Sequence, residues 1–185
     1  MSSAKKACIS SVCVALCYVL PLAFHAMALG GMLSPMHIPV FLCGLVCGWP
    51  YGAFCGIAGP VISSLLSGMP STVQLIHMVP ELCAYGLISG LLMERIHTGH
   101  VCADLCCAMV PAMVLGRVIG GGARALFYMA SARAYSVALW ASAYFVESLP
   151  GIVLHILVVP TLAVMLMRAG LVPLRYPPDR KECAV

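Results

Sequence analysis

The chain of 185 residues is strongly apolar, with 62% hydrophobic and only 9% charged residues. Its mean hydropathy is +1.03, and soluble domains carry roughly 25% charged residues, so the composition excludes a water-soluble globular domain. The formal net charge of +4 is spread over both ends and the connections rather than gathered in one stripe, which argues against a nucleic-acid-binding surface.

Apolar runs bounded by glycine, proline and charged residues predict six membrane-spanning helices. Their approximate ranges are 7–31, 38–48, 51–67, 74–94, 102–129 and 136–168. The first run exceeds the roughly 15 apolar residues of a signal peptide, so we interpret it as a retained span. The prediction is an all-α membrane protein, a six-transmembrane-helix bundle with a single domain over 1–172 and a short basic cytoplasmic tail over 173–185.

The second run is too short to cross a bilayer alone, because a span needs about 20 mostly apolar residues. We therefore expect the turn at Gly48-Trp49-Pro50-Tyr51-Gly52 to lie within membrane depth, covered by protein.

Lysine and arginine residues predict the orientation. With six spans, the inner side carries Lys5, Lys6, Arg95, Arg168, Arg175, Arg180 and Lys181, whereas the outer connections carry Arg133. The positive-inside rule then puts both termini in the cytoplasm, and the connections 32–38, 68–73 and 130–135 face outward.

Small residues follow one face of the first span at Ala7, Ser11 and Ala15, each four residues apart. Such a stripe allows another helix to approach closely in lipid. It predicts either packing inside the bundle or a docking face for a separate membrane subunit.

Three ionisable residues, Glu81, Arg117 and Glu147, lie inside the last three predicted spans. Ionisable groups at that depth are costly and normally face a partner or a polar cavity. Two interpretations are compatible: a structural Glu–Arg bridge between helices, or a polar binding pocket to which Arg124 contributes if it faces inward.

No motif for hydrolysis or nucleotide binding is present. The run from Arg117 to Arg124 contains three glycines but lacks the Lys-Ser/Thr ending of a phosphate loop, so we interpret the glycines as sites of close helix approach or a local break beside a ligand. We therefore expect no enzyme, no resident cofactor and no metal. The 11 cysteines stand mostly inside apolar runs, where a thiol acts as a small hydrophobe; metal or redox chemistry is the alternative.

The connection around Ser34-Pro35-Met36-His37-Ile38-Pro39 contains two prolines that restrict it, as suits a lid. His37 is either a solvated loop residue or a ligand contact. The aromatic residues Tyr85, Tyr128, Trp140 and Tyr144 either anchor the chain at the membrane interface or stack on a ring-containing ligand.

The chain as a whole resembles the substrate-binding S component of an energy-coupling factor (ECF) transporter, a family of six-span vitamin and micronutrient binders. The resemblance covers about residues 7–170 and is carried by the segments 34–40, 43–52, 59–70, 81–92, 116–117 and 149–152. The small stripe Ala7/Ser11/Ala15 resembles the face that docks on the transmembrane coupling subunit, although the usual motif favours alanine at position 11.

The resemblance implies a ligand site open to the outside in a multi-pass protein of the cell membrane. The implied contacts are His37, Met69, Glu81, Tyr85, Arg117, Arg124, Tyr128, Tyr144 and Glu147. It also implies three partner chains: the coupling subunit and two ATP-binding subunits, which use the ATP.

The substrate stays open among water-soluble vitamins and related micronutrients. The arginines suit a carboxylate, as in pantothenate, riboflavin or folate-like compounds, whereas the acids and aromatic rings suit a queuosine precursor or a pyridoxine-like ring. The alternatives to a transport subunit are a lipid-modifying membrane enzyme that uses Glu81 or Glu147, and a structural or assembly subunit.

Overall fold

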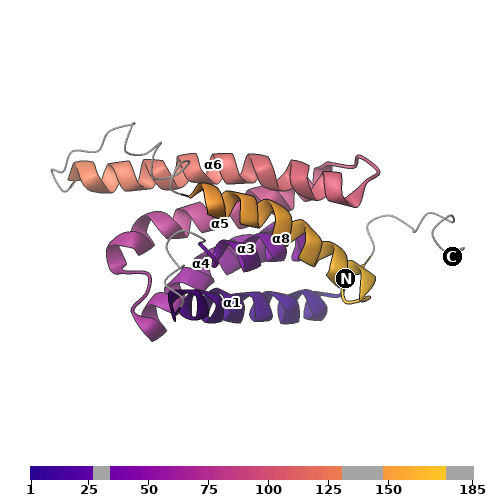
Figure 1. Ribbon diagram of the computed structural model, residues 1–185, viewed down its shortest axis with the longest axis horizontal. Helices are drawn as coiled ribbons and strands as arrows, with labels where there is room; N and C mark the ends of the chain where they lie inside the picture. The colour runs from indigo at the N-terminus through magenta and orange to yellow at the C-terminus, as the bar shows by residue number, and fades with distance from the viewer. Residues whose placement is uncertain (27–33, 131–147, 174–185) are drawn as a thin grey trace, which may run out of the picture.

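The computed structural model describes residues 1–26, 34–130 and 148–173. Within these residues the fold is entirely helical. The helices are α1 (Ser3–Ala26), α3 (His37–Cys47), α4 (Trp49–Ser67), α5 (Thr72–Arg95), α6 (Val101–Ala130) and α8 (Leu149–Arg168). Figure 1 shows them as one bundle, with α1 and α6 at opposite edges and α3 between them.

The short helix α3 is the centre of the bundle. It contacts each of the other five described helices, and all of its 11 residues except Val46 are buried. Its environment is therefore protein, which explains how so short an apolar helix can lie among spans. The other five described helices are long and apolar enough to cross a membrane.

The break between α3 and α4 is shorter than the turn predicted over residues 48–52. Only Gly48 separates the two helices, and its φ of 97° is one that glycine adopts readily. Trp49 already begins α4, because Pro50 stands in the first turn, where a helix needs no amide hydrogen from it. The prediction of a five-residue turn was therefore wrong in extent.

Glycines set the close packing of α4 against α5. A side chain at Gly86 would overlap the backbone of Gly52, and one at Gly56 would overlap the backbone at Leu82. Backbones that approach this closely gain dispersion contacts, which drive helix association in lipid.

Local signals in the sequence fix the helix ends. Helix α4 ends at Gly68 in a left-handed conformation with φ of 72°, and α5 begins with a capping box in which Gln74 accepts from the Ser71 amide at 3.2 Å. In the connection between α5 and α6, Thr98 donates to the buried carboxylate of Asp104, from its amide at 2.8 Å and from its hydroxyl at 2.6 Å.

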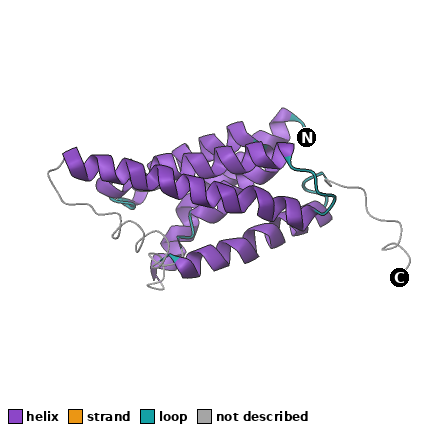
Figure 2. Cartoon of the chain, turned by 90° about the horizontal axis from the view of Figure 1, so that it is seen from above, coloured by secondary structure: helices purple, strands orange, loops and turns teal. Residues whose placement is uncertain are grey.

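The described part of the chain begins and ends at the same end of the bundle. The start of α1 and the end of α8 lie at the same end, together with the connection between α5 and α6 (Figures 1 and 2). This arrangement agrees with an even number of crossings, as predicted.

Candidate ligand-binding site

Two histidines meet at the start of α3. His37, the first residue of α3, donates from Nδ1 to the Ser34 carbonyl at 2.9 Å, and His155 of α8 donates from Nε2 to the same oxygen at 3.3 Å. Ser34 has a φ of 42°, an uncommon left-handed conformation for a serine. Its carbonyl thus serves both histidines and joins α8 to the segment before α3.

A carboxylate of α5 completes this contact. The Tyr85 hydroxyl donates to Glu81 Oε1 at 2.6 Å, and His37 Nε2 lies 3.9 Å from the same oxygen. Because His37 uses Nδ1–H on Ser34, protonation of Nε2 would make it an imidazolium facing the carboxylate. Glu81 is 6% exposed and Tyr85 is fully buried, so the group is sheltered from solvent.

Four rings surround these polar atoms. His37 stacks on His155 with centroids 5.3 Å apart and lies 5.2 Å from the Tyr85 ring. Phe41, one turn along α3, stacks on Tyr85 at 4.9 Å. Offset stacking of this kind is favourable, so the cluster offers flat surfaces beside one carboxylate.

Arg117 brings a cation from α6 into the same region. It is 5% exposed and donates from Nη1 to the Ser148 hydroxyl at 2.5 Å. Its neighbour Gly116 leaves room for the Tyr85 ring, since a side chain there would overlap it.

Within the glycine run of α6, Gly120 permits close helix approach, one of the two roles predicted for the run. A Cβ at Gly120 would lie 2.8 Å from Glu81 Cβ and Oε2, so glycine at this position allows α6 to pass next to the carboxylate.

The groups that form this candidate site come from α3, α5, α6 and α8 and from residues that precede α3 and α8; Ser34 contributes its backbone carbonyl. We define the polar cluster as Ser34, His37, Phe41, Glu81, Tyr85, Arg117, Ser148 and His155. His37 is not a solvated loop residue, since its side chain is only 9% exposed; its role as a ligand contact stays a prediction.

The direct Glu81–Arg117 bridge is not formed. Among the described residues, the basic side chain within 4.0 Å of the Glu81 carboxylate is the imidazole of His37, and Arg117 contacts Ser148 instead. Glu147, the third predicted member of that bridge, lies outside the described residues.

The remaining predicted contacts are not among the residues of the polar cluster or lie outside the described residues. Arg124 packs over Tyr128 at 5.6 Å from its ring centroid, about two turns along α6 from Arg117. Met69 is 38% exposed in the connection between α4 and α5, where its carbonyl accepts from Ser63 at 2.8 Å. Tyr144, like Trp140, falls in the undescribed range 131–147.

The small stripe on α1 faces away from the bundle. Ala7, Ser11 and Ala15 are all exposed, whereas α1 packs on α3 and α4 through the opposite side, where Ser10, Cys13 and Cys17 are buried. The structure therefore excludes the interpretation that the stripe packs inside the bundle.

Sequence reasoning missed Phe41, Ser148 and His155. Phe41 stands in an apolar run and Ser148 beside one, so neither differs from ordinary span residues. His155 carries a weak signal, since a histidine inside an apolar span is itself a costly polar group.

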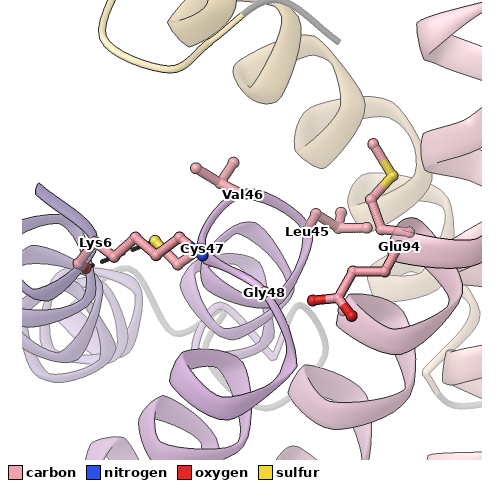
Figure 3. A pocket seen from close by; sticks show the side chains of 8 residues that line it. Lys6, Leu45, Val46, Cys47, Gly48 and Glu94 are labelled. Carbon is pink, nitrogen blue, oxygen red and sulfur yellow. Dashed lines mark hydrogen bonds between the residues drawn. The ribbon is translucent and has the colours of Figure 1, made fainter. Parts of the chain in front are cut away.

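A pocket lies at the end of α3 opposite His37. The 11 residues from His37 to Cys47 span about 15 Å along the helix axis. The pocket has a volume of about 200 Å³ and is lined by Lys6, Leu45, Val46, Cys47, Gly48, Gly90, Met93 and Glu94. Figure 3 shows Lys6 and Glu94 on opposite sides of the Cys47–Gly48 segment, with the Cys47 thiol donating to the Lys6 carbonyl at 3.7 Å. None of the predicted ligand contacts lines it.

In the described part of the chain, no group of three or more His, Cys, Asp or Glu side chains is arranged to hold a metal. Long apolar helices around a buried cluster of polar and aromatic side chains define a multi-pass membrane protein with a candidate site for a small molecule.

The family model of the ECF transporter substrate-specific component matches residues 5–163. The chain therefore belongs to the family of substrate-specific components of ECF transporters. No curated protein and no solved structure matches it. It is a multi-pass protein of the plasma membrane and a transport subunit.

Proposed function

We propose that the polar cluster binds the cargo of an ECF importer with high affinity. The observation that carries this proposal is the convergence of Glu81, Tyr85 and His37 with Arg117 from separate helices in a buried setting. Charged groups and hydrogen-bond donors buried together at membrane depth cost free energy, so such a group usually serves a function. A ligand that replaced their mutual contacts would be held by several directed bonds.

The cargo that this chemistry favours is a small water-soluble vitamin or micronutrient with a flat ring. Glu81 accepts from ring or amino N–H groups, the rings of Phe41 and Tyr85 stack on a heterocycle, and Arg117 pairs with a carboxylate or carbonyl. Riboflavin and folate-like compounds satisfy all three, and a deazapurine queuosine precursor or a pyridoxine-like ring satisfies the first two. The aliphatic pantothenate uses only the arginine well.

Transport by this chain requires partners. We propose that the exposed face of α1 with Ala7, Ser11 and Ala15 docks on the transmembrane coupling subunit, because three small exposed side chains permit close helix contact. Two ATP-binding subunits then supply the energy, since the chain contains no nucleotide-binding motif.

Thermal unfolding of the purified chain in detergent tests the binding proposal. A ligand that binds only the folded state at 100 times its Kd adds about 2.7 kcal/mol of stability, so the panel should include riboflavin, folate, pyridoxine, pantothenate and a deazapurine. We expect one compound to raise the unfolding temperature, and Glu81→Gln to remove that rise.

Glu94→Gln is the matched control, because Glu94 is an exposed carboxylate on the same helix at the other end of α5. It should leave the ligand-induced rise intact. If no compound stabilises the chain and no coupling subunit copurifies with it, a structural or assembly role replaces the proposal.

A further inference from the structure

Five free cysteines form a buried group where α1, α3 and α4 meet. They are Cys13 and Cys17 of α1, Cys43 and Cys47 of α3, and Cys55 of α4, and none is more than 2% exposed. All five belong to one cluster of buried side chains. The cysteines therefore lie in the shared core of three helices.

One pair within this group is placed to react. The Sγ atoms of Cys17 and Cys55 lie 4.0 Å apart, and both residues are fully buried. A disulfide requires an S–S distance of about 2 Å and Cα atoms within about 7 Å. Side-chain rotation can supply the remaining approach of the sulfurs if the two helices are close.

Helices α1 and α4 do approach closely at this level. Gly59 lies one turn after Cys55 on α4, and a Cβ there would be 2.8 Å from the Cys17 Cβ and Sγ. The absence of a side chain at Gly59 thus brings the backbone that carries Cys55 against Cys17. The pairs Cys13–Cys17 on α1 and Cys43–Cys47 on α3 each lie on a single helix, so a disulfide within either pair would join no two helices.

The burial of this pair selects the kind of reagent that can reach it. Charged oxidants do not enter an apolar helix interface readily, because desolvating an ion is costly. An uncharged electrophile, which the thiol sulfur attacks before it loses its proton, is suited to this setting.

We propose that Cys17 and Cys55 form an oxidative modification site, where an uncharged halogen oxidant such as molecular iodine or hypochlorous acid joins α1 to α4 by a disulfide. With iodine, the first thiol becomes a sulfenyl iodide and releases one HI. The second sulfur then displaces iodide from it, forms the S–S bond and loses its proton, which leaves as a second HI. The two thiols together lose two electrons, which reduce I₂ to two iodide ions.

The disulfide would also act on the segment before α3. The Cys17 thiol donates to the Met36 carbonyl at 3.8 Å, and Met36 directly precedes His37 of the polar cluster. Disulfide formation removes that donor.

The test uses the full chain in lipid vesicles. Exposed thiols are first blocked with a maleimide, the vesicles are treated with iodine, and the protein is then unfolded, alkylated and digested. We expect one linked peptide pair that contains Cys17 and Cys55, with a mass about 2 Da below the sum of the two thiol peptides, and loss of the linked pair after dithiothreitol.

Cys17→Ala and Cys55→Ala should each abolish the linked pair, and Cys13→Ala, a buried cysteine of the same helix, should retain it. The wild-type peptide map decides the question even if a variant does not fold. A linkage through Cys43, or complete alkylation of both buried thiols after iodine treatment, would overturn the proposal and leave these cysteines as packing residues only.

Discussion

Glu81 is a buried carboxylate in a helix long enough to cross the membrane, and its immediate neighbours lower the cost of that position. The Tyr85 hydroxyl donates to it at 2.6 Å, a distance typical of a charge-assisted O–H···O⁻ bond. His37 adds an imidazole at 3.9 Å. Each of these groups is buried, so the loss of one leaves a polar atom that water cannot readily satisfy.

Tyr85→Phe should therefore destabilise the unliganded protein. The change keeps the ring stack with Phe41 but removes the donor to Glu81, and hydrogen bonds to charged groups contribute about 1.5–3 kcal/mol. We expect a lower unfolding temperature in detergent, measured without ligand.

Tyr18→Phe is the control, since Tyr18 lies on α1, which contributes no residue to the polar cluster. Equal unfolding temperatures for Tyr85→Phe and the wild type would show that the Tyr85–Glu81 bond contributes nothing to stability.

The sequence could predict only part of the polar cluster. Glu81 and Arg117 were predictable because an ionisable residue inside an apolar run is unusual by itself. The role of the Ser34 carbonyl was not predictable, since it depends on a left-handed φ of 42° that the sequence does not indicate. His155 meets His37 only because α8 packs on α3, a contact between residues far apart in the chain.

Helix ends were predictable where proline, glycine or a cap marks them. The range 51–67 became Trp49–Ser67, and 74–94 became Thr72–Arg95, with capping or left-handed residues at the boundaries. Hydropathy alone could not show that α3 is enclosed by the other five described helices, because burial in protein and exposure to lipid favour the same apolar residues.

At the scale of helix pairs, Gly86→Ala should disrupt the packing of α4 on α5. The new methyl group would overlap the Gly52 backbone, and backbone cannot move aside as a flexible side chain can. Overpacking costs typically about 1–3 kcal/mol, so we expect a clear fall in unfolding temperature and in the yield of monodisperse protein.

Gly122→Ala is the matched control on α6, because nothing lies within 4 Å of a Cβ at that position. Alanine is favoured over glycine inside a helix by about 0.5–1 kcal/mol, so this variant should be as stable as the wild type or slightly more so. A Gly86→Ala protein with unchanged stability would mean that α4 and α5 are farther apart than described.

The exposed stripe of α1 gives a second prediction at this scale. Ala15→Leu places a bulky side chain on the proposed docking face without touching the core, since Ala15 is exposed. We expect ligand binding by the isolated chain to be unchanged, whereas uptake in vesicles with the coupling and ATP-binding subunits should fall about tenfold or more if the contact loses about 1.4 kcal/mol.

Ala169→Leu, an equal change at an exposed residue after α8, should leave uptake unaffected. Full uptake by the Ala15→Leu protein would exclude this face as the docking surface.

In the whole molecule, the basic residues at the start of α1 and at the ends of α5 and α8 lie at the same end of the bundle. Lys5 and Lys6 open α1, Arg95 ends α5 and Arg168 ends α8, and these three positions share one end of the bundle (Figure 1). The connection between α4 and α5 at the opposite end carries no Lys or Arg over 68–71. Cytoplasmic loops carry the excess of basic residues, so this end should face the cytoplasm.

Reporter fusions test that orientation. A fluorescent protein fused after Val185 should fluoresce, and alkaline phosphatase at the same position should be inactive, because the phosphatase folds only outside the cytoplasm, where its disulfides form. Phosphatase inserted after Gly68 should be active, and after Gly99 inactive, since these glycines lie in connections at opposite ends of α5. Active phosphatase after both Val185 and Gly99 would invert the topology and turn the polar cluster's end of the bundle toward the cytoplasm, which an importer that captures its cargo outside cannot have.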